Sequence, residues 1–174
     1  MNCTGLSSIT LPNGMKTIEG STFYGCTNLS AITIPDSVLD IGQYAFYSCE
    51  NLNNLELPDN LESIGVGAFQ LCSGLNSITI PKSVEVIDNY IFESCRNLTN
   101  VTILDGVKKI SNGAFEYCHS LSDLTIPNSV AEIGEGAFYQ CENLKSVSIS
   151  RKCKIYRRPY EAHSFPSTCK ITYR

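Results

Sequence analysis

The sequence contains no tryptophan and only two methionines and two histidines, and just 17% of its 174 residues are charged. No apolar run approaches the roughly 18 residues that a membrane-spanning helix needs, which excludes such a helix. The first twenty residues have neither a basic start nor a continuous apolar stretch, so we expect no signal peptide there. A hydrophobic fraction of 43% excludes wholesale disorder and fits one folded domain.

Motifs that carry chemistry are also absent. The sequence has no G-x-S-x-G elbow, P-loop, H-E-x-x-H pair or Rossmann fingerprint. Its cysteines form no C-x₂₋₄-C pair, which excludes the usual structural zinc site. The histidines, His119 and His163, lie beside no candidate nucleophile and are interpreted as surface residues. We therefore expect a protein without catalytic activity, bound metal or cofactor.

What the sequence does contain is nine cysteines, seven of which recur at intervals of 23 residues. A fixed interval of this size is typical of a solenoid, in which each coil buries its apolar face against its neighbours. We interpret the cysteines as a structural column of small buried residues, because side chains in register do not suit the dihedral angle of a disulfide. The column consists of Cys3, Cys26, Cys49, Cys72, Cys95, Cys118 and Cys141.

Apolar positions repeat at the same interval. In each unit two apolar residues alternate with polar ones, as Ile78 and Ile80 do, which predicts a short strand with these side chains inward. Proline follows in most units and turns the chain into a second extended piece, although Leu104 replaces it in the fifth unit. The A-F-x-x-C segment is long enough for one turn of α- or 3₁₀-helix. We expect tight turns with positive φ at the glycines after the second extended piece, which are Gly42, Gly65 and Gly134.

This frame resembles the leucine-rich repeat, and in particular its BspA-like subclass, whose unit ends in I-G-x-x-A-F-x-x-C. The resemblance covers residues 1 to about 150, as six full units and the start of a seventh, with Thr22 in place of Ala in the first. It implies an α/β solenoid: a right-handed coil with a parallel sheet on its concave face and short helical or 3₁₀ turns elsewhere. Because Met1 enters in the middle of a unit, we expect the chain to be part of a longer array.

The resemblance also implies a cell-surface or secreted protein that acts in adhesion, binding host or cell-surface proteins or glycans. That role follows from the family, and the residues themselves leave open a structural spacer without a ligand of its own. The formal net charge of −4 makes nucleic acid an unfavoured partner.

Outward positions of the predicted sheet are the candidate binding residues, since solenoids recognise partners on their extended concave face. They are small and polar, without an aromatic or arginine anchor, so a shallow polar surface or a glycan fits better than an apolar peptide. A ladder of threonines also stabilises a sheet without any ligand. The candidates are Asn54, Glu56, Thr79, Asn100, Thr102, Asp123 and Thr125.

Several polar and aromatic residues outside these columns have structural interpretations. Aspartates at the corners after the strands suit turns, because a calcium site would need oxygen ligands from several sides; they are Asp36, Asp59 and Asp105. The asparagines of two sequons, Asn28 and Asn97, share a repeat position that in leucine-rich repeats bonds the neighbouring turn, and a third sequon begins at Asn2. Tyrosines flank the phenylalanine column, where packing between units is favoured over a second binding surface; they are Tyr24, Tyr44, Tyr47, Tyr90 and Tyr139.

Charge is distributed unevenly along the chain. Residues 1–144 contain 5 Lys and Arg against 16 Asp and Glu, a net charge of −11, whereas residues 145–174 contain 8 against 1, a net charge of +7. We interpret residues 151–174 as a basic, degenerate final repeat that caps the array, in preference to an anion-binding patch. Phe165 resembles a member of the phenylalanine column displaced by four residues. A disulfide between Cys153 and Cys169 is a less favoured alternative to free thiols.

Overall fold

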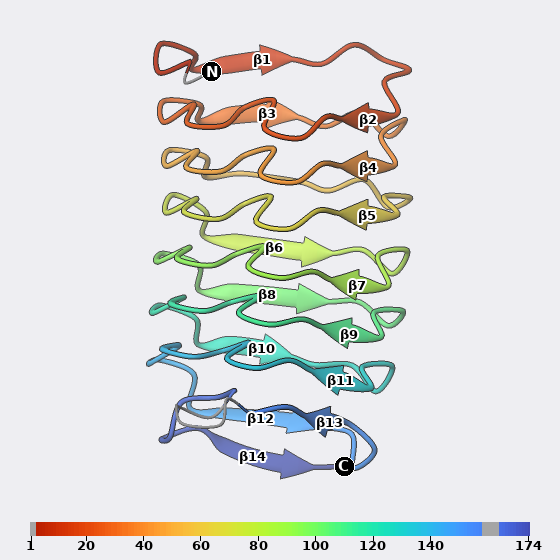
Figure 1. Ribbon diagram of the computed structural model, residues 1–174, viewed down its shortest axis with the longest axis vertical. Coiled ribbons are helices and arrows are strands. Elements are labelled where there is room, and N and C mark those ends of the chain that lie inside the picture. Colours follow the sequence, from red (N-terminus) through yellow and green to blue (C-terminus); the bar gives the residue numbers. More distant parts are fainter. Residues whose placement is uncertain (1–2, 158–163) are drawn as a thin grey trace.

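The computed structural model describes residues 3–157 and 164–174, apart from the side chain of Asp123. The chain coils into a stack along one long axis, with the termini at opposite ends (Figure 1). Each 23-residue unit makes one coil, and neighbouring coils pair in parallel, so that Ile9 lies beside Ile32 and Ile78 beside Val101. The predicted solenoid with a parallel sheet is therefore confirmed.

One side of the stack consists of strands of three or four residues. Their side chains alternate as predicted, with Ile78 and Ile80 buried and Ser77 and Thr79 exposed. Hydrogen bonds join these strands as β1–β3, β6–β8–β10 and β12–β14. Their bounds are β1 (Ser8–Thr10), β3 (Ala31–Thr33), β6 (Ser77–Ile80), β8 (Asn100–Ile103), β10 (Asp123–Thr125), β12 (Ser146–Ile149) and β14 (Lys170–Tyr173).

A second side of the stack also forms parallel sheets, where the sequence indicates no more than an extended piece. Each strand has two residues, the second of which is an inward-facing isoleucine, and the strands pair as β2–β4–β5 and β7–β9–β11–β13. Their bounds are β2 (Thr17–Ile18), β4 (Asp40–Ile41), β5 (Ser63–Ile64), β7 (Val86–Ile87), β9 (Lys109–Ile110), β11 (Glu132–Ile133) and β13 (Lys154–Ile155).

The third side contains no helix within the described residues, so the expected helical turns are wrong. Two residues per unit adopt left-handed φ here, four positions apart, such as Tyr44 (55°) and Ser48 (58°), and a right-handed helix cannot continue through them. Successive amides alternate: Phe46 N–H donates to the next coil, and Tyr47 N–H donates to Tyr44, three residues back. This side is a series of linked turns. We call it the turn face, made of residues 20–27, 43–50, 66–73, 89–96, 112–119 and 135–142.

The glycines that follow the two-residue strands are needed for a different reason from the one expected. Gly42, Gly65 and Gly134 do not have positive φ, so that prediction is wrong. Instead, the preceding coil passes so close that a Cβ on Gly42 would lie 2.4 Å from the amide nitrogen of Gly20. A Cβ on Gly65 would likewise lie 2.6 Å from the amide nitrogen of Gln43. Close approach of two backbones therefore explains these glycines.

The apolar columns fill the interior between the three sides. The rings of Phe69 and Phe92 are completely buried, and their centroids stack 5.5 Å apart. The column continues into the C-terminal part of the chain, because the ring of Phe165 stacks on Phe138 at 4.9 Å. An unbroken aromatic column thus runs from Phe23 to Phe165.

A glycine on the turn face offers a test of this packing. Gly67 has a φ of +61°, and a Cβ there would lie 2.3 Å from Cε1 of the Tyr44 ring. We expect Gly67→Ala to lower the free energy of unfolding by about 2 kcal/mol, because the ring and the left-handed backbone both disfavour a side chain. In a Tyr44→Gly background the cost should fall to about 1 kcal/mol, since only the backbone contribution remains. Urea unfolding of the native chain, the two single variants and the double variant measures both costs. An equal cost of Gly67→Ala in both backgrounds would contradict the role of the ring.

Candidate functional site

The candidate residues from the sequence all lie on the side of the stack that carries the three- and four-residue strands, which we call the sheet face. Thr79, Thr102 and Thr125 occupy one exposed column of β6, β8 and β10, each paired with the next. Asn100 pairs with Asp123 in the adjacent column, although the Asp123 side chain lies outside the described part of the structure. These residues form a regular ladder.

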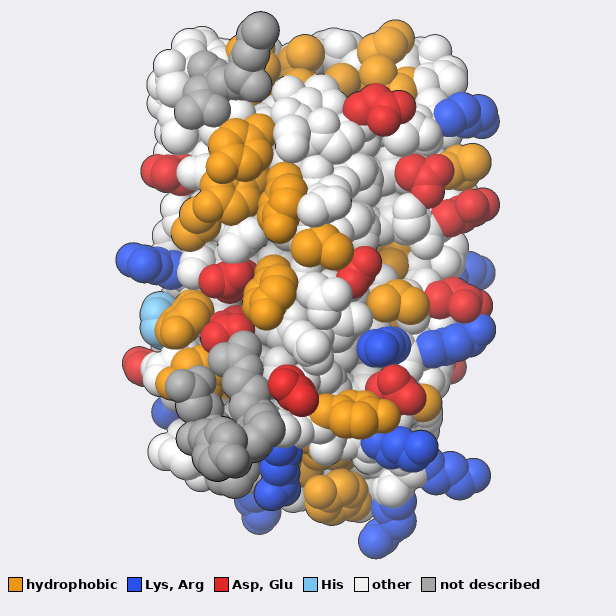
Figure 2. Space-filling model, in the orientation of Figure 1, with side chains coloured by type: hydrophobic (Ala, Val, Ile, Leu, Met, Phe, Trp, Pro, Cys, Tyr) orange, Lys and Arg blue, Asp and Glu red, His pale blue; other side chains and the backbone are white. Residues whose placement is uncertain are grey.

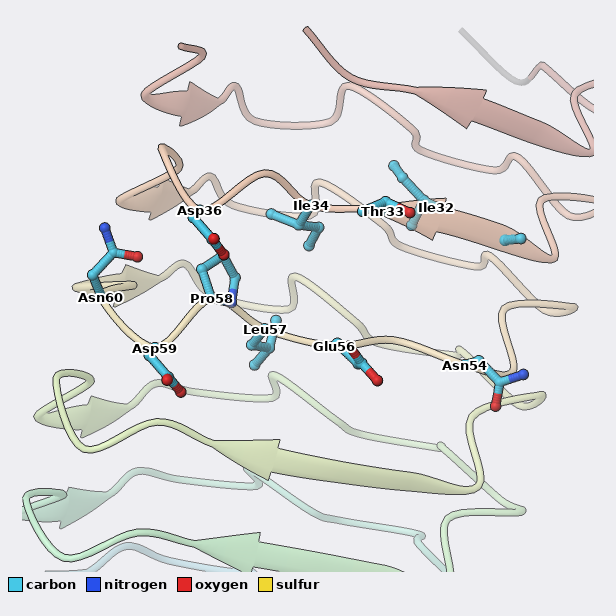
Figure 3. A pocket seen from close by; sticks show the side chains of 11 residues that line it. Ile32, Thr33, Ile34, Asp36, Asn54, Glu56, Leu57, Pro58, Asp59 and Asn60 are labelled. Atoms are coloured by element: carbon cyan, nitrogen blue, oxygen red, sulfur yellow. The ribbon is translucent and has the colours of Figure 1, made fainter. Parts of the chain in front are cut away.

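The sheet face is interrupted at the third coil. In the part of the chain that the structure describes, residues 54–57 form no strand, and Asn54 joins the sheet through a single bridge to Ala31. A groove of about 730 Å³ opens there between the second and third coils (Figure 3). Its polar lining residues are Thr33, Asp36, Asn54, Glu56, Asp59 and Asn60. The structure thus brings two candidates, Asn54 and Glu56, into one concave site.

The sequence of the third coil accounts for the interruption. Its inward residues are Leu55 and Leu57, and its outward residues are Asn54 and Glu56. None of the four is β-branched, whereas every other unit has at least one valine, isoleucine or threonine at these positions. Asparagine and glutamate are depleted in strands, and leucine fits a pleated surface less well than isoleucine or valine. Low strand propensity in one unit was therefore the signal in the sequence for the groove.

The groove is acidic. Asp36, Glu56 and Asp59 are exposed along it, and its lining residues include no lysine, arginine or histidine. Asp36 and Asp59 were predicted as turn residues of separate corners. The structure shows that the two corners lie side by side and that both aspartates line the groove. Carboxylates and amides at such a site can accept hydrogen bonds from the hydroxyl, amide or cationic groups of a ligand.

The cysteine column lies inside the stack, except for Cys3, which is exposed at its first coil. Each thiol from Cys49 to Cys141 donates a hydrogen bond to a phenylalanine carbonyl of the preceding coil, as from Cys95 to Phe69 at 3.2 Å. Burial raises the pKa of the Cys49 thiol to about 12, and the neighbouring Cys26 adds to the rise. Burial likewise raises the pKa of Cys72 and Cys118 well above 9.0. The thiols therefore remain protonated donors rather than nucleophiles.

The remaining cysteines and histidines, which could in principle react or bind a metal, do not form a common site. Cys153 and Cys169 are both free and half-buried. His119 is half-buried beside Tyr117, and His163 lies outside the described residues. Within the described ranges, no three His, Cys, Asp or Glu side chains gather as a metal site would require.

The asparagine column makes contacts between coils. Asn28 Nδ2 donates to the Thr4 carbonyl at 2.6 Å, and Asn51 Nδ2 donates to Asn28 Oδ1 at 3.2 Å. These bonds occupy the Asn28 side chain in the stack, whereas Asn2 lies outside the described residues.

Basic side chains gather at the C-terminal end of the stack (Figure 2). Most are exposed, but Arg174 is used structurally, because its guanidinium donates to Asn128 Oδ1 at 3.0 Å and to the Ile126 carbonyl. In this way the last residue ties β14 back to the corner that follows β10. No helix in the described residues is long and apolar enough to cross a membrane.

Comparison with known proteins identifies similar repeat proteins. A family model described as a BspA-type leucine-rich repeat region matches residues 1–119 and 63–172, with six copies of the repeat. A search of curated proteins found no match.

Solved structures agree with the family model. A leucine-rich repeat protein from Eubacterium ventriosum is 27% identical, with a TM-score of 0.83 over 95% of this chain and 44% of that one. One from Bacteroides ovatus is 25% identical, with a TM-score of 0.58 over 99% of this chain and 55% of that one. A leucine-rich cell surface protein from Faecalibacterium prausnitzii is 26% identical, with a TM-score of 0.61 over 87% and 49%.

This chain spans about half the length of these three proteins, which cover it with 44%, 55% and 49% of their own residues. The family model, by contrast, matches nearly every unit of the chain, with the same repeat that the cysteine interval predicts. The chain therefore belongs to the BspA-type leucine-rich repeat family.

Proposed function

We propose that this chain is a non-enzymatic interaction module that binds a protein or glycan partner through its sheet face. Leucine-rich repeat proteins of this type are generally interaction or surface modules. The groove at the third coil is the single observation that carries the proposal. It is a concave site of about 730 Å³ beside the regular ladder of β6, β8 and β10.

The composition of the groove fits a polar partner. Buried Ile32 and Ile34 supply an apolar base, and Asn54, Glu56 and Asp59 supply hydrogen-bond acceptors beside it. Ligand sites combine apolar surface with a few placed polar groups in this way. An anionic partner such as nucleic acid is disfavoured by the three carboxylates.

The setting that we propose is a cell surface or the extracellular space. One of the similar structures is a cell surface protein of Faecalibacterium prausnitzii, and the family itself occurs in surface modules. Free thiols buried in the core are compatible with either a reducing or an oxidising compartment, because burial protects them from oxidants.

Binding by groove variants tests the proposal. Soluble matrix proteins and immobilised oligosaccharides are screened against the whole chain, and the double substitution Asn54→Ala with Glu56→Ala is compared with the native sequence. We expect at least tenfold weaker binding of the selected partner, since each lost hydrogen bond to a buried ligand group costs about 1–2 kcal/mol.

The matched control is Ser146→Ala, an exposed position of β12 at the other end of the sheet face, which should bind normally. If the double substitution binds as the native chain does while Thr79→Ala with Thr102→Ala loses affinity, the site is the ladder and the groove is excluded. If no partner binds at all, the second candidate function stands: a structural spacer, favoured by a threonine ladder that stabilises the sheet without a ligand.

A further inference from the structure

Tyrosine is concentrated on the turn face. Six of the nine tyrosines of the chain lie in its segments: Tyr24, Tyr44, Tyr47, Tyr90, Tyr117 and Tyr139. All are partly exposed, and Tyr90 and Tyr117 each expose 37% of their surface. Figure 2 shows hydrophobic side chains grouped among acidic ones over the upper and middle coils of the visible face. Tyrosine is among the residues that most often anchor protein interfaces.

The rings form clusters rather than isolated contacts. Tyr24 and Tyr47 stack at 4.6 Å with an interplanar angle of 7°, and Tyr44 meets Tyr47 edge-on at 5.9 Å. Further along the stack, Tyr117 meets Tyr139 edge-on at 5.8 Å. Each cluster spans neighbouring coils, so the exposed rings form a discontinuous aromatic stripe parallel to the long axis.

The fold does not require tyrosine at these positions. Tyr44 and Tyr90 adopt left-handed φ values of 55° and 57°, which is unfavourable for an aromatic residue. Glycine occupies the same position in three other coils, at Gly67, Gly113 and Gly136, with φ of 61° to 63°. Two coils thus hold an exposed aromatic ring at a backbone cost that glycine would avoid. The Tyr44 ring lies against Gly67 of the next coil and the Tyr90 ring against Gly113, so packing accounts for one part of each ring. The part that stays exposed at a strained backbone position is available to a partner.

Carboxylates accompany the rings. The six segments of the turn face contain five glutamates, and Arg96 is the one Lys or Arg among them. Glu93 accepts a hydrogen bond of 2.6 Å from Gln70. It also lies near the first ring cluster: the pKa of Tyr47 is raised by burial and by Tyr24, and the charge of Glu93 contributes in the same direction. Aromatic faces beside carboxylates attract cations, and a planar guanidinium can stack on the one and pair with the other.

We propose that the turn face is a second interaction surface, which binds an arginine-bearing segment of a basic protein partner. Arginine is favoured over lysine because the rings offer flat faces for stacking. A protein partner is favoured over an acidic glycan because the surface carries four at least partly exposed carboxylates and one basic side chain, whereas the fifth glutamate, Glu116, is buried. This surface lies on a different side of the coil from the groove, so the two proposals stand or fall separately.

The test uses a peptide whose arginines match the repeat. Tyr44 and Tyr90 lie two coils apart, or about 10 Å at the spacing of paired strands. A polyproline II helix presents every third residue on one side at about 9 Å intervals, so the probe is (Arg-Pro-Pro)₄. Matched peptides replace arginine with lysine or with uncharged citrulline. Binding to the whole chain is measured by fluorescence polarisation at low and high salt.

The variant is Tyr44→Gly with Tyr90→Gly, which places in these coils the residue that other coils already hold. Thermal unfolding verifies that it folds. We expect the arginine peptide to bind the native chain at least fivefold more tightly than the lysine peptide. We also expect the variant to bind it at least tenfold more weakly, and the groove variant Asn54→Ala with Glu56→Ala to bind it normally.

Four results would overturn the proposal. The first is no binding of the arginine peptide, and the second is equal binding of both basic peptides that the tyrosine substitutions leave unchanged, which would reflect net charge alone. The third is loss of peptide binding in the groove variant instead. A neutral oligosaccharide that binds the native chain in place of the peptide, and is lost in the tyrosine variant, would likewise replace the cationic partner with a glycan.

Discussion

Raising the pH above about 9 is expected to unfold this protein cooperatively, by about pH 10 to 11, because its buried thiols cannot ionise in place. Burial raises the pKa of Cys49 from 9.0 to about 12, and the pKa of Cys72 and Cys118 is raised well above 9.0. Below pH 9 both states hold these protons. Above it the unfolded chain loses them while the native state does not, so stability falls by about 1.4 kcal/mol per pH unit for each thiol.

Burial raises the pKa strongly for five thiols of the column, from Cys49 to Cys141. Their summed slope of about 7 kcal/mol per pH unit exhausts an ordinary stability of about 5–15 kcal/mol within one or two pH units. Urea unfolding followed by circular dichroism between pH 7 and 11 measures the slope. Lysine and tyrosine titrate in the same range, so the control is Cys72→Ala with Cys118→Ala, in which the slope should be shallower by about two protons. An unchanged slope in this variant would assign the effect to other groups.

Removal of one ring from the middle of the aromatic column is expected to cause a large loss of stability. Phe92 is completely buried and stacks on Phe69 at 5.5 Å and on Phe115 at 5.3 Å. We expect Phe92→Ala to lower the free energy of unfolding by about 4 kcal/mol, the usual cost of removing a buried ring that cannot be replaced by local collapse. Equilibrium unfolding in urea provides the value.

The matched control is Val86→Ala, a substitution at a position of the same coil that is 42% exposed, which should cost less than about 0.5 kcal/mol. Because each coil contacts only its neighbours, removal of Phe92 should also separate the unfolding of the two halves of the stack and broaden the transition. A loss below 1 kcal/mol with a single sharp transition would show that the column does not hold the coils together.

The stacking of the coils could be predicted from the sequence because it depends on periodicity alone. Side chains such as Leu75 and Leu98 recur at the same place in every unit, and a recurring apolar residue has to pack against its own equivalents. The parallel register of β6 and β8 follows from the same interval. None of this requires knowledge of how any single residue is oriented.

The turn face could not be predicted in this way. Leu71, Ser94 and Tyr117 adopt left-handed φ without being glycine, so the usual signal for that conformation is missing from the sequence. The A-F-x-x-C segment has the composition of a helical turn, and the left-handed residues become evident only when the hydrogen bonds to the next coil are seen, as from Leu71 N–H to the Glu93 carbonyl.

The groove was partly accessible from the sequence. Asn54 and Glu56 differ from the threonine and serine of other units, and this difference placed them among the candidate binding residues. Their joint location with Asp36 and Asp59 was not predicted, because it depends on a lost strand pairing between two coils. The thiol donors were likewise missed, since the position of a carbonyl in the preceding coil is a property of the stack and not of the unit.

The missing strand at the third coil has a mechanical consequence. The second and third coils share few hydrogen bonds on the sheet face, whereas on the turn face Tyr44, Phe46 and Ser48 each donate to the third coil. Since β4 also pairs with β5, the second and third coils are hydrogen-bonded along two sides of the stack and only weakly joined along the sheet face. Force applied across the long axis is therefore expected to open the sheet face at this junction before it separates the two bonded sides, which would widen the groove.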